Sequence, residues 1–138
     1  MKKYLFLIPL LWAVNCWSVG ISSGTFTIGP GQNFTNLAAF QSSLTGGTPM
    51  IGDATAQINA LDWESGTIDF AALNSAGYTI HITLANSLKH SGYWDGTKSS
   101  WTVSSGNLIR CRANKKFDFN GLQISNTGTG YLFNIDAG

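Results

Sequence analysis

The feature that most constrains the fold is a series of short alternating segments in residues 117–138, FDFNGLQISNTGTGYLFNIDAG. Apolar and polar residues alternate in 117–119, 122–124 and 132–135, and this is the pattern of β-strands with one buried face. An Asn-Gly bend separates the first two segments, and a turn rich in Ser, Asn, Thr and Gly precedes the third. Short strands joined by short turns predict a coil of a parallel β-solenoid and not a stack of hairpins.

A repeat in the sequence supports this interpretation. Ile109 and Cys111 alternate with two arginines, and the same apolar spacing returns 24 residues later at Phe133 and Ile135. A period in the low twenties suits one turn of a solenoid. The repeat therefore predicts that these two segments lie one above the other, with Cys111 pointing inward.

Four further strands are predicted upstream, at residues 25–28, 56–61, 67–70 and 78–84. In the last of these, the residues expected to point inward are Tyr78, Ile80, Ile82 and Leu84. His81 should then point outward. A helix is predicted at residues 35–44, capped by Thr35, because Leu37, Phe40 and Leu44 follow helical spacing. This helix is expected to cover the apolar end of the first coil.

The first twenty residues have the layout of a secretory signal peptide. Lys2 and Lys3 precede an apolar run over residues 4–14, and Ser18 and Gly20 offer a cleavage site. The run is too short for a stable membrane span. We therefore expect residues 1–20 to be removed and the protein to be secreted or held in the cell envelope.

Cys16 leaves a lipoprotein anchor open as an alternative, although Asn15 stands where a small residue is expected. Cleavage would remove two of the eight basic residues, leaving six against seven acidic ones. Cys111 would be the only cysteine of the mature chain, so no intramolecular disulfide could form. The near-neutral balance argues against a nucleic-acid partner.

The segments TFTIGPGQNFTNLAAFQSSL, YTIHIT, His-Ser-Gly and FDFNGLQISN together resemble the pectin-lyase-like superfamily, especially its uncharacterised secreted members from bacteria and phages. The resemblance spans residues 25–138. It implies an all-β fold, a right-handed parallel β-helix with an N-terminal capping α-helix, of which this chain would be the N-terminal portion. Residues 21–48 would form the first strand and the cap, and residues 49–138 the first coils, with an insertion at about 85–100.

The superfamily's motifs in this chain mark the cap and the turns, so they imply a fold and no activity. Its lyases use Ca²⁺-binding aspartates and a basic residue that acts as the base. This sequence has basic residues but no comparable group of aspartates on neighbouring coils. No catalytic residue, metal site or cofactor is therefore carried over from the resemblance.

The candidate ligand-binding residues fall into two groups. The first lies in the insertion, where aromatic rings could stack on sugars while polar groups bind hydroxyls: His90, Tyr93, Trp94 and Asp95. The second is Arg110 and Arg112, which share one strand face and could bind the carboxylates of a uronate-containing polysaccharide. The alternatives are that the aromatics pin the loop to the solenoid and that the arginines form a solvated face.

The sequence leaves three functions open. The first is a secreted binding or surface protein, adhesin-like, with a polysaccharide as ligand. The second is a polysaccharide lyase or glycoside hydrolase whose catalytic residues lie beyond residue 138, and the third is a structural stalk. Because no second amphipathic helix follows residues 132–135, we expect the chain to be part of a longer protein or to associate end to end.

Overall fold

The computed structural model describes residues 21–45, 48–61, 66–89, 92–93, 95, 97–98, 100–103, 108–112 and 114–136. The elements in chain order are β1 Gly24–Ile28, α1 Leu37–Leu44, β2 Ala54–Ile58, β3 Ile68–Asp69, β4 Thr79–Leu84, η1 Asn86–Leu88, β5 Ser100–Val103, β6 Ile109–Arg112, β7 Lys116–Asn120, β8 Gln123–Asn126 and β9 Phe133–Asp136. Across these ranges the chain is mostly β-structure, with one α-helix and one short 3-10 helix (η1).

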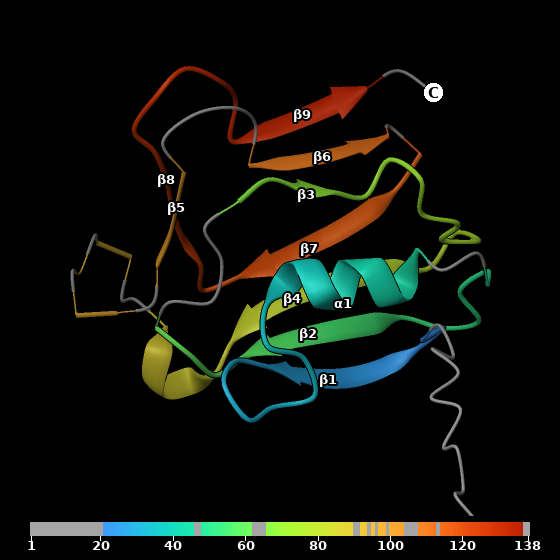
Figure 1. The fold of residues 1–138 in the computed structure, drawn as a ribbon, viewed down its shortest axis with the longest axis horizontal. Helices are drawn as coiled ribbons and strands as arrows, with labels where there is room; N and C mark the ends of the chain where they lie inside the picture. The colour runs from blue at the N-terminus through green and yellow to red at the C-terminus, as the bar shows by residue number, and fades with distance from the viewer. Residues whose placement is uncertain are drawn as a thin grey trace, which may run out of the picture.

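The strands form three sheets in which all strand pairs are parallel. Their orders are β1-β2-β4-β7, β3-β6-β9 and β5-β8. Figure 1 shows β3, β6 and β9 above the strands of the four-stranded sheet, with β5 and β8 at the left. The helix α1 contacts β3. Because β4, β5 and β6 pair with β7, β8 and β9 respectively, the chain visits the three sheets twice in the same order.

The strand register confirms the repeat found in the sequence. Ile109 pairs with Phe133 and Cys111 with Ile135, at the predicted spacing of 24 residues. Cys111 is buried, as predicted. Since side chains alternate between the faces of a strand, this register also places the arginines of β6 together on the outer face.

The interior is filled by alternate side chains of β2 and β4. These residues are all buried: Ala54, Ala56, Ile58, Ile80, Ile82 and Leu84. The small alanines of β2 lie in register with the isoleucines of β4, and the pairing puts small and large side chains on one inner face. The inward positions predicted for β4 are thus confirmed for its aliphatic residues.

The helix is confirmed, but its predicted cap is wrong. α1 begins at Leu37, and the side chain of Asn36 accepts a hydrogen bond from the Ala39 amide at 2.8 Å. Asn36 is therefore the N-cap, in the position that had been assigned to Thr35. Leu37, Phe40 and Leu44 are buried in the core, so the helical spacing of these residues is confirmed.

One prediction about the interior is corrected, and one strand is added. Tyr78 precedes β4 and is 39% exposed, because Ala76 and Gly77 before it adopt positive φ angles and turn the chain. Strand β5, Ser100–Val103, follows the insertion and was not predicted. Trp101 is fully buried, and its indole Nε1 donates to the Gly66 carbonyl at 3.2 Å.

The other predicted strands exist with shifted ends. The strand predicted at 56–61 lies at Ala54–Ile58, and the one at 67–70 is only Ile68–Asp69. The three segments that opened the sequence analysis are β7, β8 and β9. The predicted signal peptide lies outside the described residues.

Candidate functional site

A polar hollow of about 310 Å³ lies on the outer face of the four-stranded sheet, over β2, β4 and β7. Its polar lining consists of Thr55, His81, Thr83, Asp118 and Asn120. The parallel register puts Thr55, His81 and Asp118 in one row across the three strands, and Thr83 beside Asn120 in the next. The hollow is thus built from outward positions of neighbouring strands, which the buried inward positions hold in place.

His81 lies between two carboxylates in this hollow. Its Nδ1 is 3.0 Å from Oδ2 of Asp118, and its Nε2 is 3.7 Å from Oδ2 of Asp53. Because an ionised carboxylate only accepts hydrogen bonds, Nδ1–H is the donor to Asp118. Asp53 is itself held by the Thr79 amide, which donates to its Oδ1 at 2.8 Å. The hydrogen bond to Asp118 therefore orients the imidazole ring, and Asp53 lies near its other nitrogen.

The chemistry of the hollow suits a ligand rich in hydroxyl groups. Threonine hydroxyls and the Asn120 amide both donate and accept hydrogen bonds, and the carboxylate of Asp118 accepts them. The two carboxylates beside His81 make the site unfavourable for an anionic ligand. The described lining contains one apolar residue, Ile82, whose side chain is buried on the other face.

The insertion is attached to β8 through Gln123, which is buried. The Asp95 amide donates to Oε1 of Gln123 at 2.5 Å, and Nε2 of Gln123 donates back to the Asp95 carbonyl at 2.9 Å. Nζ of Lys98 donates to the Ser87 carbonyl at 3.2 Å, which ties the loop to η1. These bonds hold the backbone of Asp95 beside β8 and the side chain of Lys98 beside η1.

Among the predicted sugar-binding residues of the insertion, Tyr93 is 83% exposed. The Asp95 carboxylate accepts hydrogen bonds from the hydroxyl of Thr97 at 2.7 Å and from its amide at 2.9 Å. The Thr97 hydroxyl, followed by the Thr97 amide, holds the pKa of Asp95 below its ordinary value. Asp95 thus stabilises a turn of the loop. His90 and Trp94 lie outside the described residues.

Arg110 and Arg112 lie on the same exposed face of β6, as predicted. Nη1 of Arg110 is 3.4 Å from Oδ2 of Asp69 on the neighbouring strand β3. The other oxygen of Asp69 accepts from the Ala71 amide at 2.7 Å. Both partners of the ion pair are about half exposed, so the pair adds little stability.

The two predicted groups belong to different sheets. The arginines are on β6 of the three-stranded sheet, and the insertion is attached to β8 of the two-stranded sheet. The described members of these groups, Tyr93, Asp95, Arg110 and Arg112, do not line the polar hollow. The structure therefore separates three surfaces that could bind a ligand: the insertion, the arginine face of β6 and the polar hollow.

Sequence analysis placed His81 on the outer face but did not find its partners. Asp118 lies 37 residues further along the chain, and no local motif joins the two. The signal that could have found the pair is the alignment of YTIHIT with KFDFN as stacked strands, which puts His81 opposite Asp118. Without that register, the two residues are unrelated positions in the sequence.

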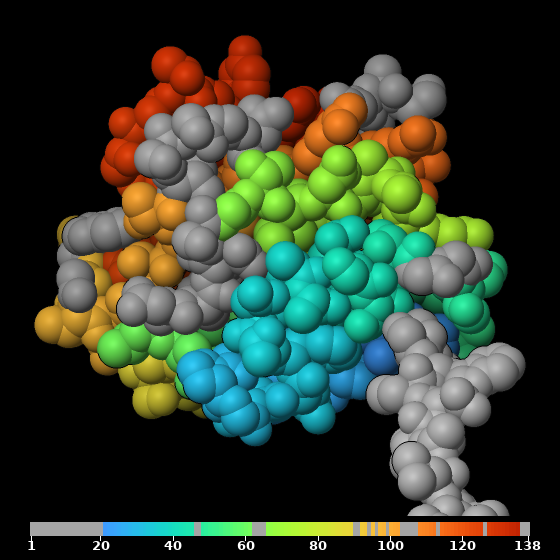
Figure 2. Space-filling view, in the orientation of Figure 1, coloured from blue at the N-terminus to red at the C-terminus, as the bar shows by residue number. Residues whose placement is uncertain are grey.

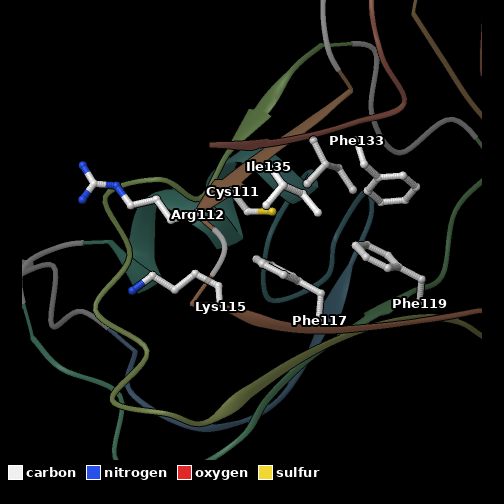
Figure 3. Close-up of a pocket in the computed structure, with 8 residues that line it drawn as sticks. Cys111, Arg112, Lys115, Phe117, Phe119, Phe133 and Ile135 are labelled. Atoms are coloured by element: carbon white, nitrogen blue, oxygen red, sulfur yellow. The ribbon is translucent and has the colours of Figure 1, made fainter. Parts of the chain in front are cut away.

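A second hollow, of about 250 Å³, is mainly apolar and lies between β7 and the strands β6 and β9. Its lining is Ile109, Cys111, Arg112, Lys115, Phe117, Phe119, Phe133 and Ile135. Figure 3 shows the rings of Phe117, Phe119 and Phe133 converging with Ile135, and the two basic side chains to one side. The rings of Phe119 and Phe133 have centroids 5.1 Å apart.

No family model, curated protein or solved structure matches this chain. Within the described ranges, no group of three or more His, Cys, Asp or Glu side chains is arranged to hold a metal ion. In the same part of the chain, no helix is long and apolar enough to cross a membrane.

Proposed function

We propose that the three parallel sheets are the walls of a right-handed parallel β-helix, closed at its N-terminal end by α1. Support comes from the order in which the chain visits the sheets and from the 24-residue offset between β6 and β9. The resemblance of residues 25–138 to the pectin-lyase-like superfamily points to the same fold. We further propose that the protein is exported after loss of residues 1–20; an exported protein whose mass retains Met1 would contradict this.

Carbohydrate binding is the function that we propose for this protein. The observation that carries the proposal is the polar hollow, in which hydroxyl, amide, imidazole and carboxylate groups stand in register on a flat strand surface. A saccharide presents hydroxyl groups at regular spacing, and each can both donate and accept a hydrogen bond. The ordered rows of Thr55, His81 and Asp118 and of Thr83 and Asn120 complement such a ligand.

The ligand that best fits the hollow is a neutral polysaccharide. The carboxylates of Asp53 and Asp118 would repel a uronate, whereas they accept hydrogen bonds from neutral sugar hydroxyls. The arginine face of β6 would favour the opposite ligand, an acidic polysaccharide. The two surfaces therefore predict opposite charge preferences, and these can be separated by experiment.

The experiment compares the binding of neutral and uronate-containing polysaccharides by affinity electrophoresis and calorimetry. The double variant Thr83→Ala/Asn120→Ala should weaken binding of the neutral ligand about tenfold or more, because two hydrogen-bonding groups are lost. Thr102→Ala, an exposed threonine on β5, is the matched control and should bind normally. Unchanged binding in the double variant, with loss in Arg110→Gln/Arg112→Gln, would move the site to β6.

A polysaccharide lyase or glycoside hydrolase is the second candidate, and the His81–Asp118 pair favours it. A carboxylate that orients an imidazole through Nδ1 is suited to proton transfer at Nε2, and Nε2 of His81 lies 3.7 Å from Asp53, beyond hydrogen-bond distance. The test is incubation with the polysaccharide that binds, followed by detection of new reducing ends or of unsaturated products. Cleavage that His81→Gln abolishes would establish an enzyme, and binding without cleavage would leave a binding protein.

A further inference from the structure

The two ends of the strand stack differ in how their edges are covered. At the N-terminal end, the Thr27 amide donates to Oδ1 of Asn33 at 2.9 Å, and the Thr27 carbonyl accepts from the Phe34 amide at 3.1 Å. The rings of Phe26, Phe34 and Phe40 pack together, with centroids 5.7 to 6.0 Å apart. In Figure 2, the atoms around α1 (cyan) cover the front of this end. The outer edge of β1 is therefore occupied at Thr27.

At the opposite end, β7, β8 and β9 are the terminal strands of their sheets within the described part of the chain. The apolar hollow lies between two of these strands, and Phe133 and Ile135 are 42% and 63% exposed there. Exposed strand edges beside an apolar surface are a template for strand pairing. This end therefore combines backbone groups and an apolar patch that a partner would cover.

The backbone of β7 shows which residues a partner strand would meet. The Ala85 amide donates a hydrogen bond to the Ile58 carbonyl of β2. The backbone N–H and C=O groups of odd-numbered residues in β4 therefore point toward β2, and those of even-numbered residues point toward β7. Ile80 is the register partner of Phe117. In a parallel ladder, the backbone of Ile80 forms hydrogen bonds with the two residues on either side of Phe117, Lys116 and Asp118, and not with Phe117 itself. The backbone groups of Phe117 and Phe119 are consequently directed toward the outer edge.

We propose that two copies of this chain pair through antiparallel contact between their β7 strands, about a two-fold axis that passes through Phe117. In an antiparallel pair, opposite residues lie on the same face of the sheet. This axis places Lys116 of each copy opposite Asp118 of the other, so the contact contains two Lys–Asp pairs. An axis through Asp118 would instead set the two aspartates against each other, and like charges in that position are destabilising.

The Asp118 carboxylate can serve both contacts. Its Oδ2 faces His81 at 3.0 Å, so Oδ1 is available to the ammonium group of Lys116 in the second copy. Both residues are exposed on the outer face of β7. The same axis brings the two apolar hollows together, with the aromatic side chains of each copy covering those of the other.

The partner surface is the open end of a second copy and not its N-terminal end. A head-to-tail contact would need the outer edge of β1, and at Thr27 the loop carrying Asn33 and Phe34 already bonds to this edge. β1 and α1 contain no acidic residue. A head-to-tail contact with these two elements would therefore give Lys116 no carboxylate to pair with. Because the open ends pair with each other, the assembly closes as a dimer and does not grow into a fibre.

Charge exchange at β7 tests both the surface and the register. In sedimentation velocity, the unaltered chain should be a dimer. Lys116→Asp and Asp118→Lys should each weaken self-association about tenfold or more, since each sets like charges opposite one another in both contacts. An equimolar mixture of these two variants should form a heterodimer, because each carries the charge that the other needs. The double variant Lys116→Asp/Asp118→Lys should dimerise with itself.

Lys98→Asp makes the same charge change on the insertion and should leave the dimer intact. Circular dichroism spectra that match the unaltered chain establish that each variant is folded, and native mass spectrometry identifies the mixed dimer. A monomeric unaltered chain, assembly that grows with concentration beyond a dimer, or a mixture of folded variants that stays monomeric would each overturn the proposal. Full dimerisation of Lys116→Asp alone would overturn it too.

Discussion

At the scale of single residues, two glycines with nearly the same backbone conformation have different surroundings. Gly31 has a φ angle of +73°, and an added Cβ would meet nothing within 4 Å. Gly121 has a φ angle of +76°, and its Cβ would lie 2.6 Å from Cγ of Lys89. The predicted Asn-Gly bend thus needs glycine for its conformation and also because the Lys89 side chain lies against it.

Replacing each glycine with alanine separates these two effects. Both variants should lose about 1–2 kcal/mol of stability from the left-handed conformation. Gly121→Ala should lose roughly 0.5–1.5 kcal/mol more, because the Lys89 side chain must leave its rotamer. Urea unfolding measures both losses. Equal losses would mean that the Lys89 contact has no cost.

Asp95 gives a pH-dependent property to the insertion. Hydrogen bonds from Thr97 lower the pKa of Asp95 in the folded protein below its ordinary value of 3.8. The ionised form is therefore favoured by folding, and its contribution is present above pH 3.8 and is lost as the pH falls through the lowered pKa. The Thr97 amide signal in NMR spectra should follow this titration. If the Thr97 amide signal of Asp95→Asn showed the same pH dependence, another group would be responsible.

At the scale of elements, α1 packs its apolar face against the core. Phe40 is fully buried, and its ring lies within 6.0 Å of the rings of Phe26 and Phe34. Phe40→Asp should cost roughly 3 kcal/mol or more, because it buries a charge and removes a ring. Ser42→Asp places the same side chain on the exposed face of α1 and should be near neutral. Thermal unfolding that shifts equally in both variants would contradict a covering role for the helix.

Periodicity predicted the strands of this protein well where apolar residues alternate without interruption. β4 and the stacking of β9 on β6 were found because Ile80, Ile82 and Leu84, and then Cys111 and Ile135, keep a period of two. β5 was missed because Trp101 and Val103 alternate within a Ser- and Thr-rich context that resembles a loop. Trp101 packs in the core, and the hydrogen bond that satisfies its buried indole N–H is to Gly66, 35 positions away.

The candidate site depended on knowledge that the local sequence does not contain. The outward position of His81 follows from alternation, but its two carboxylate partners follow from the pairing of β4 with β2 and β7. The residues proposed from composition, such as Tyr93 and Arg110, lie in the loop and on β6. Aromatic and basic residues are easily recognised as candidates in a sequence. Polar residues of separate strands form a binding surface only through the strand register, which the local sequence does not show.

At the scale of the whole molecule, the two proposed properties act on the same sheet. Pairing β7 with its copy would join two four-stranded sheets into one continuous outer face. β4 would lie three strand spacings from its copy, or about 14 Å at roughly 4.7–4.9 Å per spacing. The two polar hollows would then face the same side, close enough for one polysaccharide chain to contact both.

Dimerisation should therefore raise the affinity for long ligands only. Once a polysaccharide occupies one hollow, the second binds it at a high effective concentration, and the gain can reach about 10²-fold or more. A short oligosaccharide that fills one hollow has no such gain. Calorimetry should show that Lys116→Asp weakens binding of the polymer to the level expected from one site, while binding of the oligosaccharide stays the same. Equal losses for both ligands would show that Lys116 contacts the sugar directly, and unchanged polymer binding by a monomeric variant would show that the two hollows act independently.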